Sequence, residues 1–403
     1  MDAYLLDWAN LLFRWLHVIA AIAWIGASFY FVFLDSSLVP PKAENPDGVS
    51  GEIWSVHGGG FYHARKFIGA PPYIGGHLHW FYWESYVTWI SGFLLLSVSY
   101  LWSPSSYLID PSVAQWTDIQ AIGLVLAYLV GFVLVYEAIC RFAGKPGRGD
   151  TAVAVCTAIA TVVAAWLTMH TFSGRAAFLI TGAMMATVMT TNVLFWIIPG
   201  QRRMVSSLQK GQPLDPTPGL IGKQRSVHNT YFTLPVVFTM LSNHYSFVTQ
   251  HDQRVWLLLL LMLAGALIRL FFVQRHRFLL GKSRHPWPYF AAGVVLIITA
   301  MVVAAPPTQP LGASTPSMTL ASKADSLSEL RGVLQVHCIQ CHGPAVQLKN
   351  VRLDSPEDLK RHALSVYQQV VVQKLMPMNN ITKMTDEERA VVAAWFKAGA
   401  PIQ

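Results

Sequence analysis

Charged residues are scarce in this sequence. Asp, Glu, Lys and Arg make up 12% of its 403 residues, whereas roughly 25% is usual in soluble domains. Hydrophobic residues make up 53%, and several apolar runs are long enough to cross a bilayer. The composition therefore predicts a polytopic membrane protein in contact with lipid.

Cysteine is scarce too, since four residues are too few for a disulfide framework. Cys140 and Cys156 lie in or beside apolar stretches, where cysteine behaves as a small hydrophobic residue. The formal net charge is +8, but the basic residues fall between apolar runs and form no continuous stripe. This pattern argues against nucleic acid as a partner.

Eight apolar windows have about the 20 residues that a membrane-spanning helix needs. The first has no basic segment before it and no small-residue cleavage site, so we expect it to remain as a helix and not to be a removable signal peptide. The windows are 8–34, 83–102, 119–139, 151–170, 176–198, 231–250, 255–273 and 287–305.

Lysine and arginine are unevenly distributed among the connections of these helices. Fifteen lie in the first, third, fifth and seventh connections, and only Arg175 and Arg254 lie in the alternate ones. Because positively charged short loops stay in the cytoplasm, we expect the N-terminus and everything after the eighth helix on the other side. The predicted location is a bacterial inner membrane, with the C-terminal residues in the periplasm.

The composition changes after Ala305, where a stretch rich in Pro, Ser and Thr predicts a linker. We expect three parts: an eight-helix membrane domain (1–305), the linker (306–324) and a small C-terminal domain (325–403). In the last part, helices are predicted at 326–338 and 356–374. Thr385 and Glu388 form the capping-box pattern that opens a third. The predicted fold class is all-α.

The run Cys338-Ile-Gln-Cys341-His342 has the C-x-x-C-H spacing by which c-type cytochromes attach haem. Two thiols bind the haem vinyl groups, and the imidazole binds the iron. A zinc half-site would need a second pair of ligands, which is absent, and a redox dithiol would not need the histidine. The motif predicts one covalent haem c, attached at Cys338 and Cys341 with His342 as an axial ligand.

The other axial ligand is expected after the second helix of this domain, where Leu375-Met376-Pro377-Met378 lies. The Met376–Pro377 step resembles the ligand loop of class I cytochromes c, so Met376 is the predicted ligand and Met378 its rival. Methionine ligation raises the haem potential. This haem is therefore expected to accept electrons.

Polar residues in the apolar windows indicate where the membrane domain functions, because they are costly in hydrocarbon. His228 and Asn229 lie near the cytoplasmic end of the sixth helix. His244 lies sixteen residues later, about 24 Å along a helix.

These and other polar residues form two predicted groups, each at one depth in the membrane. The inner group is His79 with His228 and Asn229, and the outer group is His17 with His244. Such residues could ligate a non-covalent haem b, bind a substrate, or form hydrogen bonds within the bundle. Arg14 and Arg269 are expected to extend their charges toward the membrane surface.

With these residues in view, the whole chain resembles the bacterial membrane-bound urate hydroxylases, which have an eight-helix membrane domain followed by a cytochrome c. The resemblance implies oxidation of urate to 5-hydroxyisourate, with electrons passed to haem c and on to another cytochrome or a terminal oxidase. It assigns no catalytic residue. It rests on the runs His17–Gly26, Ser28–Phe31, His228–Pro235, Ser242–His244 and Met376–Asn380, with Met384-Thr385 after the last.

Two other functions stay open at this point. A module that transfers electrons from quinol to cytochrome c would need paired histidines on adjoining helices, and a haem or metal transporter would need helices rich in Met or Cys. Neither pattern is strong in this sequence.

The charge count makes a testable prediction about topology. A reporter enzyme that is active only in the periplasm should be active when fused after Ala305 and inactive when fused in the 200–229 connection. A reporter that is active only in the cytoplasm should give the reverse pattern. Activity of the periplasmic reporter in the 200–229 connection would contradict the predicted orientation.

Overall fold

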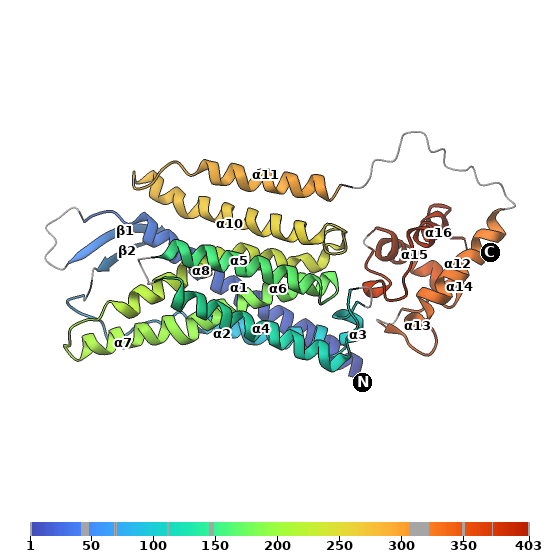
Figure 1. Cartoon of the computed structure of the whole chain (residues 1–403), viewed down its shortest axis with the longest axis horizontal. Coiled ribbons are helices and arrows are strands. Elements are labelled where there is room, and N and C mark those ends of the chain that lie inside the picture. The colour runs from blue at the N-terminus through green and yellow to red at the C-terminus, as the bar shows by residue number, and fades with distance from the viewer. Residues whose placement is uncertain are drawn as a thin grey trace.

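The computed structural model describes residues 2–41, 48–67, 69, 71–110, 113–144, 149–305, 322–348, 351–372 and 374–401, and it is mostly helical. The first 305 residues form an elongated bundle (Figure 1). Its elements are α1 (Asp2–Ser37), β1 (Val49–His57), β2 (Gly60–Phe67), α2 (Trp83–Leu96), η1 (Ser97–Leu101), α3 (Pro104–Tyr107), α4 (Asp118–Phe142), α5 (Asp150–Met169), α6 (Gly174–Thr191), η2 (Asn192–Ile197), α7 (Ile198–Gln209), α8 (Thr217–Leu241), η3 (Ser242–His244), α9 (Ser246–Thr249), α10 (Arg254–Leu279) and α11 (Trp287–Val303).

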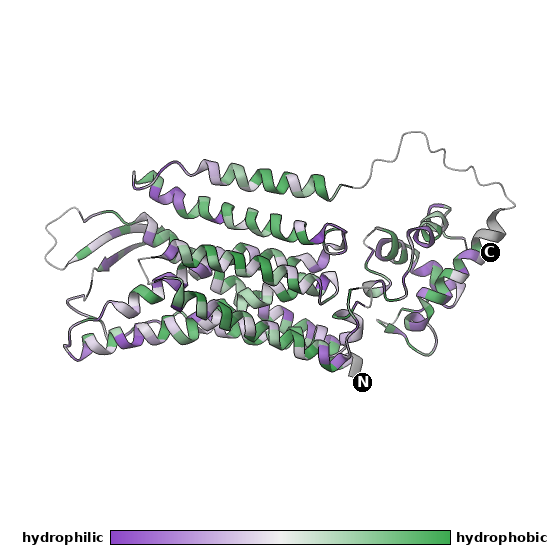
Figure 2. Ribbon diagram, in the orientation of Figure 1, coloured by the Kyte–Doolittle hydropathy of each residue, from purple (hydrophilic) through white to green (hydrophobic). Residues whose placement is uncertain are grey.

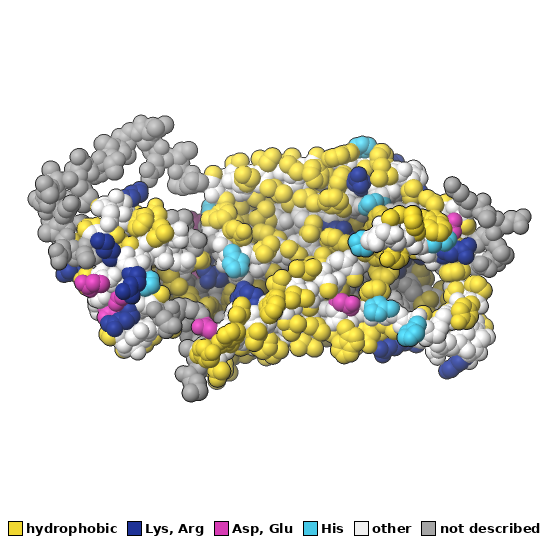
Figure 3. Space-filling model, turned by 180° about the vertical axis from the view of Figure 1, so that it is seen from behind, with side chains coloured by type: hydrophobic (Ala, Val, Ile, Leu, Met, Phe, Trp, Pro, Cys, Tyr) yellow, Lys and Arg dark blue, Asp and Glu magenta, His cyan; other side chains and the backbone are white. Residues whose placement is uncertain are grey.

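Within the part of the chain that the structure describes, five helices are long and apolar enough to cross a membrane, and α11 is a shorter apolar helix. Figure 2 shows hydrophobic residues along most of the bundle helices. Figure 3 shows that hydrophobic side chains cover much of the visible surface of the bundle. The remaining two predicted windows correspond to α2 with its π-helical continuation η1, and to the polar helix α8. The five are Tyr4–Ser37, Asp118–Phe142, Asp150–Met169, Gly174–Gln209 and Arg254–Leu279.

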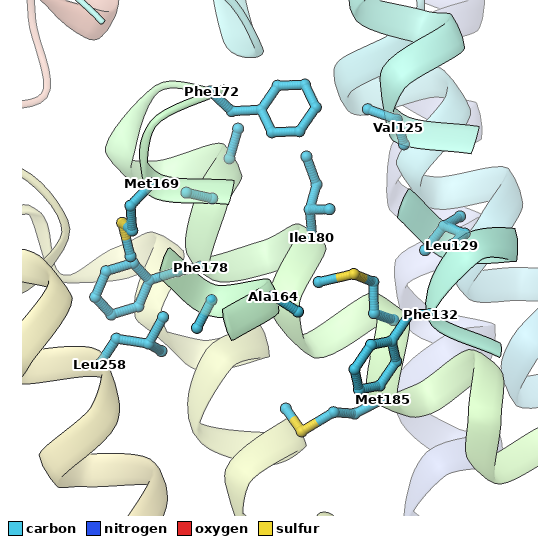
Figure 4. Packing of buried hydrophobic residues seen from close by; sticks show 14 of the residues in the cluster. Val125, Leu129, Phe132, Ala164, Met169, Phe172, Phe178, Ile180, Met185 and Leu258 are labelled. Atoms are coloured by element: carbon cyan, nitrogen blue, oxygen red, sulfur yellow. The ribbon is translucent and has the colours of Figure 1, made fainter. Parts of the chain in front are cut away.

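The helices pack through apolar stripes set by their sequence. In α4, the buried residues Val125, Leu129 and Phe132 recur at helical spacing, which places them on one face. They pack beside Ile180 and Met185 of α6, a helix that is buried on nearly all sides (Figure 4). Helix α6 is therefore the centre of the bundle.

A two-stranded antiparallel hairpin of β1 and β2 lies at one end of the bundle (Figure 1), which we call the hairpin end. Gly58 and Gly59 make the turn with φ of 58° and 80°, values that glycine adopts without steric cost. The prediction of an all-helical chain omitted this hairpin. Its sequence signal is the alternation of residues up to a Gly-Gly pair.

The C-terminal residues form a second hydrophobic core, separate from that of the bundle. Thr385 caps the last helix with the predicted reciprocal hydrogen bonds to Glu388. The linker predicted at 306–324 lies outside the described residues up to residue 321, and the domain boundaries stay predictions. The elements here are α12 (Ser322–His337), α13 (Ile339–His342), α14 (Pro356–Arg361), α15 (Ala363–Val366), η5 (Tyr367–Val372), η6 (Met378–Asn380) and α16 (Asp386–Lys397).

The C-terminal domain lies at the end of the bundle opposite the hairpin (Figure 1). There the single turn η6 packs against the short helix α3. Because η6 begins two residues after Met376, the predicted ligand loop lies next to a contact with the bundle. We call this the α3 end.

The packing of α6 against α8 makes a testable prediction. A Cβ atom on Gly182 would overlap the Thr239 side chain of α8, so Gly182→Ala should destabilise the bundle by about 1–3 kcal/mol. A Cβ on Gly131 of α4 meets nothing within 4 Å, and Gly131→Ala is the matched control. Thermal unfolding in detergent measures both. Equal melting temperatures for the two variants would contradict the close packing of α6 on α8.

Candidate functional site

A cavity of about 1090 Å³ opens among the bundle helices near the hairpin end. Its walls come from the second half of α1, the segment 78–81, η2, α7, α8 and the end of α10. Small residues make room for it, since Gly219 and Gly222 of α8 both line the space. The volume is slightly above the range of about 300–1,000 Å³ that is usual for small-molecule sites.

The charged residues around this cavity are mainly basic. Four cationic side chains line it, Lys66, Lys223, Arg277 and Lys282, against the single acid Asp35. Asp35 is paired with Lys66. The remaining positive charge favours an anionic occupant.

Five aromatic side chains lie among the apolar residues of the cavity wall. Trp24 and Phe31 come from α1, Trp80 and Phe81 from the segment before α2, and Tyr231 from α8. Arg202 lies over the Trp80 ring at 5.9 Å from its centroid, a cation–π contact that helps to hold the ring. Flat aromatic faces suit a planar ligand.

A buried hydrogen-bond network lies beside the cavity and joins α4, η2 and α8. The side-chain nitrogen of Asn192 donates to the Tyr136 hydroxyl at 3.1 Å and to the side-chain oxygen Oδ1 of Asn229 at 2.9 Å. Tyr136 and Nδ1 of His228 are 2.7 Å apart. The tautomer of His228 decides which of these two atoms donates.

The same network holds a buried charge. Arg225 pairs with Glu137 at 2.8 Å and donates to Asn192 at 3.3 Å, and it lies over the Tyr136 and Trp196 rings. A buried guanidinium needs such partners because desolvation is costly. The network thus fixes the α8 segment that supplies the cavity wall.

The inner group of predicted residues is only partly brought together. His79 and Asn229 both line the cavity, whereas His228 is directed to Tyr136. The Asn229 amide is already engaged, because its nitrogen donates to the Met189 carbonyl at 3.0 Å. Of the two inner histidines, His79 is therefore the one that lines the cavity.

The outer group is not brought together among the described residues. His17 of α1 faces α2, where its Nδ1 is 2.9 Å from the Thr88 carbonyl oxygen. Gly92 leaves room for this ring, since a Cβ there would lie 2.8 Å from His17 Cε1. His244 lies in the short η3 and is exposed. The geometry leaves Nε2 of His17 as the nitrogen that can bind a ligand.

The predicted haem residues of the C-terminal domain differ in burial. Cys338 is buried in the core and Met376 packs against it, whereas Cys341 is exposed. Nδ1 of His342 is 3.2 Å from the Val351 carbonyl oxygen, which orients the ring and directs Nε2 outward. Burial raises the pKa of the Cys338 thiol to about 12, unlike the low pKa typical of a redox-active dithiol.

Arg389 of α16 fixes the loop that contains Met376. Its guanidinium donates to the Met376 carbonyl at 2.7 Å and to the Asn380 side chain at 3.2 Å, and it also bonds the Val370 carbonyl. Met378 has no place in the core. Of the two methionines, Met376 is the one that packs against the core, and the choice of axial ligand stays a prediction.

Sequence reasoning missed Arg389 and the network residues Tyr136, Asn192 and Arg225. One signal existed for Arg389: a cation in the first turns of a helix opposes the helix dipole, which indicates another partner. Tyr136 and Asn192 gave no such signal. Each lies in an apolar helix where a single polar residue is common.

Comparison with known proteins gives one finding. The family model described as urate oxidase N-terminal matches residues 3–305, which is most of the chain and the whole bundle. Searches of curated proteins and of solved structures found no match.

The two methionines give a testable prediction for the C-terminal site. In the haem-loaded protein, Met376→Ala should abolish the weak methionine–iron charge-transfer band, because Met376 is the side chain fixed against the core. Met378→Ala is the control and should leave the band in place. Absorption spectra of the oxidised protein measure this. Loss of the band in the Met378 variant alone would make Met378 the ligand.

Proposed function

The chain belongs to the urate oxidase N-terminal family, and we propose that it oxidises urate to 5-hydroxyisourate in the cavity of the bundle. In this proposal, two parts of the chain share the reaction. The bundle binds urate, and the C-terminal domain receives the electrons through haem c. From there they pass to another cytochrome or to a terminal oxidase.

The cavity is the observation that supports urate as its occupant. Urate is a planar purine that is a monoanion at neutral pH. The cavity has aromatic faces for the ring system and four cationic side chains against one acid. Stacking and charge thus both fit this ligand.

The reaction balances without oxygen. Urate loses two electrons and two protons, and one water molecule adds at C5. A base near the ring takes a proton, and histidine is the side chain that commonly does so near neutral pH. His79 is the histidine on the cavity wall. The electrons go to two equivalents of a one-electron acceptor.

We further propose that the bundle crosses the inner membrane eight times. Helices α2 with η1, α8 and α11 join the five long apolar helices as spans. The hairpin end then faces the cytoplasm, where the basic connections lie, and the α3 end faces the periplasm. In this orientation urate enters from the cytoplasm.

Haem c fits the C-terminal residues. Cys338 and Cys341 would attach it, and His342 and Met376 would bind the iron. His342 already has its Nδ1 engaged by the Val351 carbonyl, the common arrangement for a ligating imidazole. When bound, the haem supplies a one-electron acceptor of raised potential.

The cavity and this domain lie near opposite ends of the bundle, which is too far for one tunnelling step. We therefore include a non-covalent haem b as an intermediate carrier. His17 is seven residues from Trp24, about 10 Å nearer the α3 end, and its Nε2 is free to ligate. No ring contact joins it to another histidine among the described residues, so its partner ligand stays open.

The reaction makes a testable prediction. Under nitrogen, with ferricyanide as acceptor, the full chain in lipid should consume urate and reduce two ferricyanide ions per urate. Replacing both Cys338 and Cys341 with Ala should stop this, because the haem can no longer be attached. Urate absorbance and ferricyanide absorbance measure the ratio.

Two results would contradict the proposal. Urate consumption that needs oxygen and forms hydrogen peroxide would show that oxygen, and not haem, takes the electrons. Undiminished consumption in the double cysteine variant would show that the electrons bypass the C-terminal domain.

A further inference from the structure

The two methionines of the C-terminal domain lie on a loop between η5 and α16 that is fixed by hydrogen bonds at its start. The backbone nitrogen of Met376 donates to the Gln369 carbonyl at 3.0 Å. Its carbonyl oxygen accepts from the buried guanidinium of Arg389 at 2.7 Å. Because both backbone groups of Met376 are bonded, the residues that follow it are held in place.

Met376 and Met378 differ in what covers them. Met376 packs against the C-terminal core, whereas Met378 neither belongs to that core nor packs against it among the described residues. Met378 is nevertheless half-buried. It begins the turn η6, which packs against α3 of the bundle. This contact accounts for burial that the core of its own domain does not provide.

On the side of the bundle, α3 is connected to the interior by two aromatic rings. Tyr107 of α3 and Tyr100 of η1 have ring centroids 5.7 Å apart. Tyr100 is buried, and its hydroxyl donates to the side-chain oxygen of Asn243 at 2.9 Å. The short helix that meets η6 is therefore held against the bundle by packing and by a buried hydrogen bond.

The same part of the chain leads to His17, the residue that we propose for the intermediate haem. The His17 ring packs against α2, beside the Thr88 carbonyl and Gly92. Tyr100 follows Gly92 by eight residues, in the helix η1 that directly continues α2, and eight residues span about 12 Å. One continuous segment, α2 with η1 and α3, thus connects the His17 site with the turn η6.

We propose that electrons pass from the bundle to the C-terminal domain where Met378 of η6 meets α3. Met376 lies on the core side of the loop, where the haem iron would be bound, and Met378 holds the same loop against the bundle. Each of the two electrons that urate releases reduces one equivalent of haem c from the ferric to the ferrous state. The two protons leave at the cavity. The inference rests on the proposed function, to which it adds the place of electron entry.

The test uses Met378→Glu in the oxidised, haem-loaded full chain. A carboxylate at this position would have to lose its hydration in the contact, which costs more than a tenfold change in the docking equilibrium. Reduction of the haem by urate under nitrogen should therefore be about 10-fold slower or more than in the unchanged chain. Stopped-flow absorbance of the haem measures the rate.

Two further variants serve as controls. Leu364→Glu adds the same charge to the same domain at a side chain that is 57% exposed, on the helix α15 that packs against α14 and η5 of its own domain. Met378→Leu keeps an apolar side chain in the contact and removes only the sulfur. In both variants urate should reduce the haem as fast as in the unchanged chain.

Two measurements separate electron entry from damage to the haem site. Met378→Glu should keep the methionine–iron charge-transfer band, because Met376 and its hydrogen bond to Arg389 are unchanged. Ascorbate, which reaches the haem from solution, should reduce Met378→Glu as fast as the unchanged chain. The variant should thus be slow only toward electrons that come through the bundle.

Each outcome has a distinct meaning. If urate does not reduce the haem of the unchanged chain, the proposed function fails. If urate reduces the haem of the unchanged chain and of Met378→Glu equally fast, the inference alone fails. Equal slowing in Leu364→Glu, or slower reduction of Met378→Glu by ascorbate as well, would also overturn the inference. Loss of the charge-transfer band in Met378→Leu would overturn it too, because Met378 would then be the iron ligand.

Discussion

The ion pair between Arg225 and Glu137 is the interaction on which the functional half of the bundle depends. Two charges among apolar helices are tolerated only when each has close partners, and here the pair is extended by Asn192, Tyr136 and the rings around Arg225. The network joins α4, η2 and α8 at the depth where the cavity opens. The network fixes the position of the α8 segment that forms part of the cavity wall.

The need of a buried charge for close partners also distinguishes the buried arginines of the bundle from one another. Arg225 forms an ion pair with Glu137 and has only Nε without a hydrogen-bond partner among the described residues, whereas Arg269 has neither an ion pair nor a partner for Nε and Nη2 there. The cationic rim of the cavity favours an anionic ligand. In the proposed function, substrate binding and redox transfer take place at opposite ends of the bundle, with the Met376 loop against α3 at the far end.

Composition and spacing predicted much of this arrangement. Apolar windows located the long helices because length and hydropathy dominate helix formation in lipid, and the Thr385 capping box located α16 from local geometry alone. The hairpin was missed because its alternation is short and its pairing is not local. His228 and Asn229 were correctly placed in a polar helix, but which of them faces the cavity depends on Tyr136 and Asn192, residues from two other helices. The expectation that Arg269 extends its charge toward the membrane surface is wrong, because the residue is buried. The sequence gives its position along the helix but not the side chains that surround it.

The most direct test of this account is to mix the oxidised full chain with urate under nitrogen, without any other acceptor, and follow the haem spectrum. The account predicts that urate reduces the haem of the C-terminal domain in the full chain, with up to two haem equivalents reduced per urate. Pyridine haemochrome analysis of the same sample should give b-type haem in addition to the c-type. An unchanged spectrum with urate, together with full reduction by a reduced quinone, would contradict the account and make the chain a quinol-oxidising electron-transfer module.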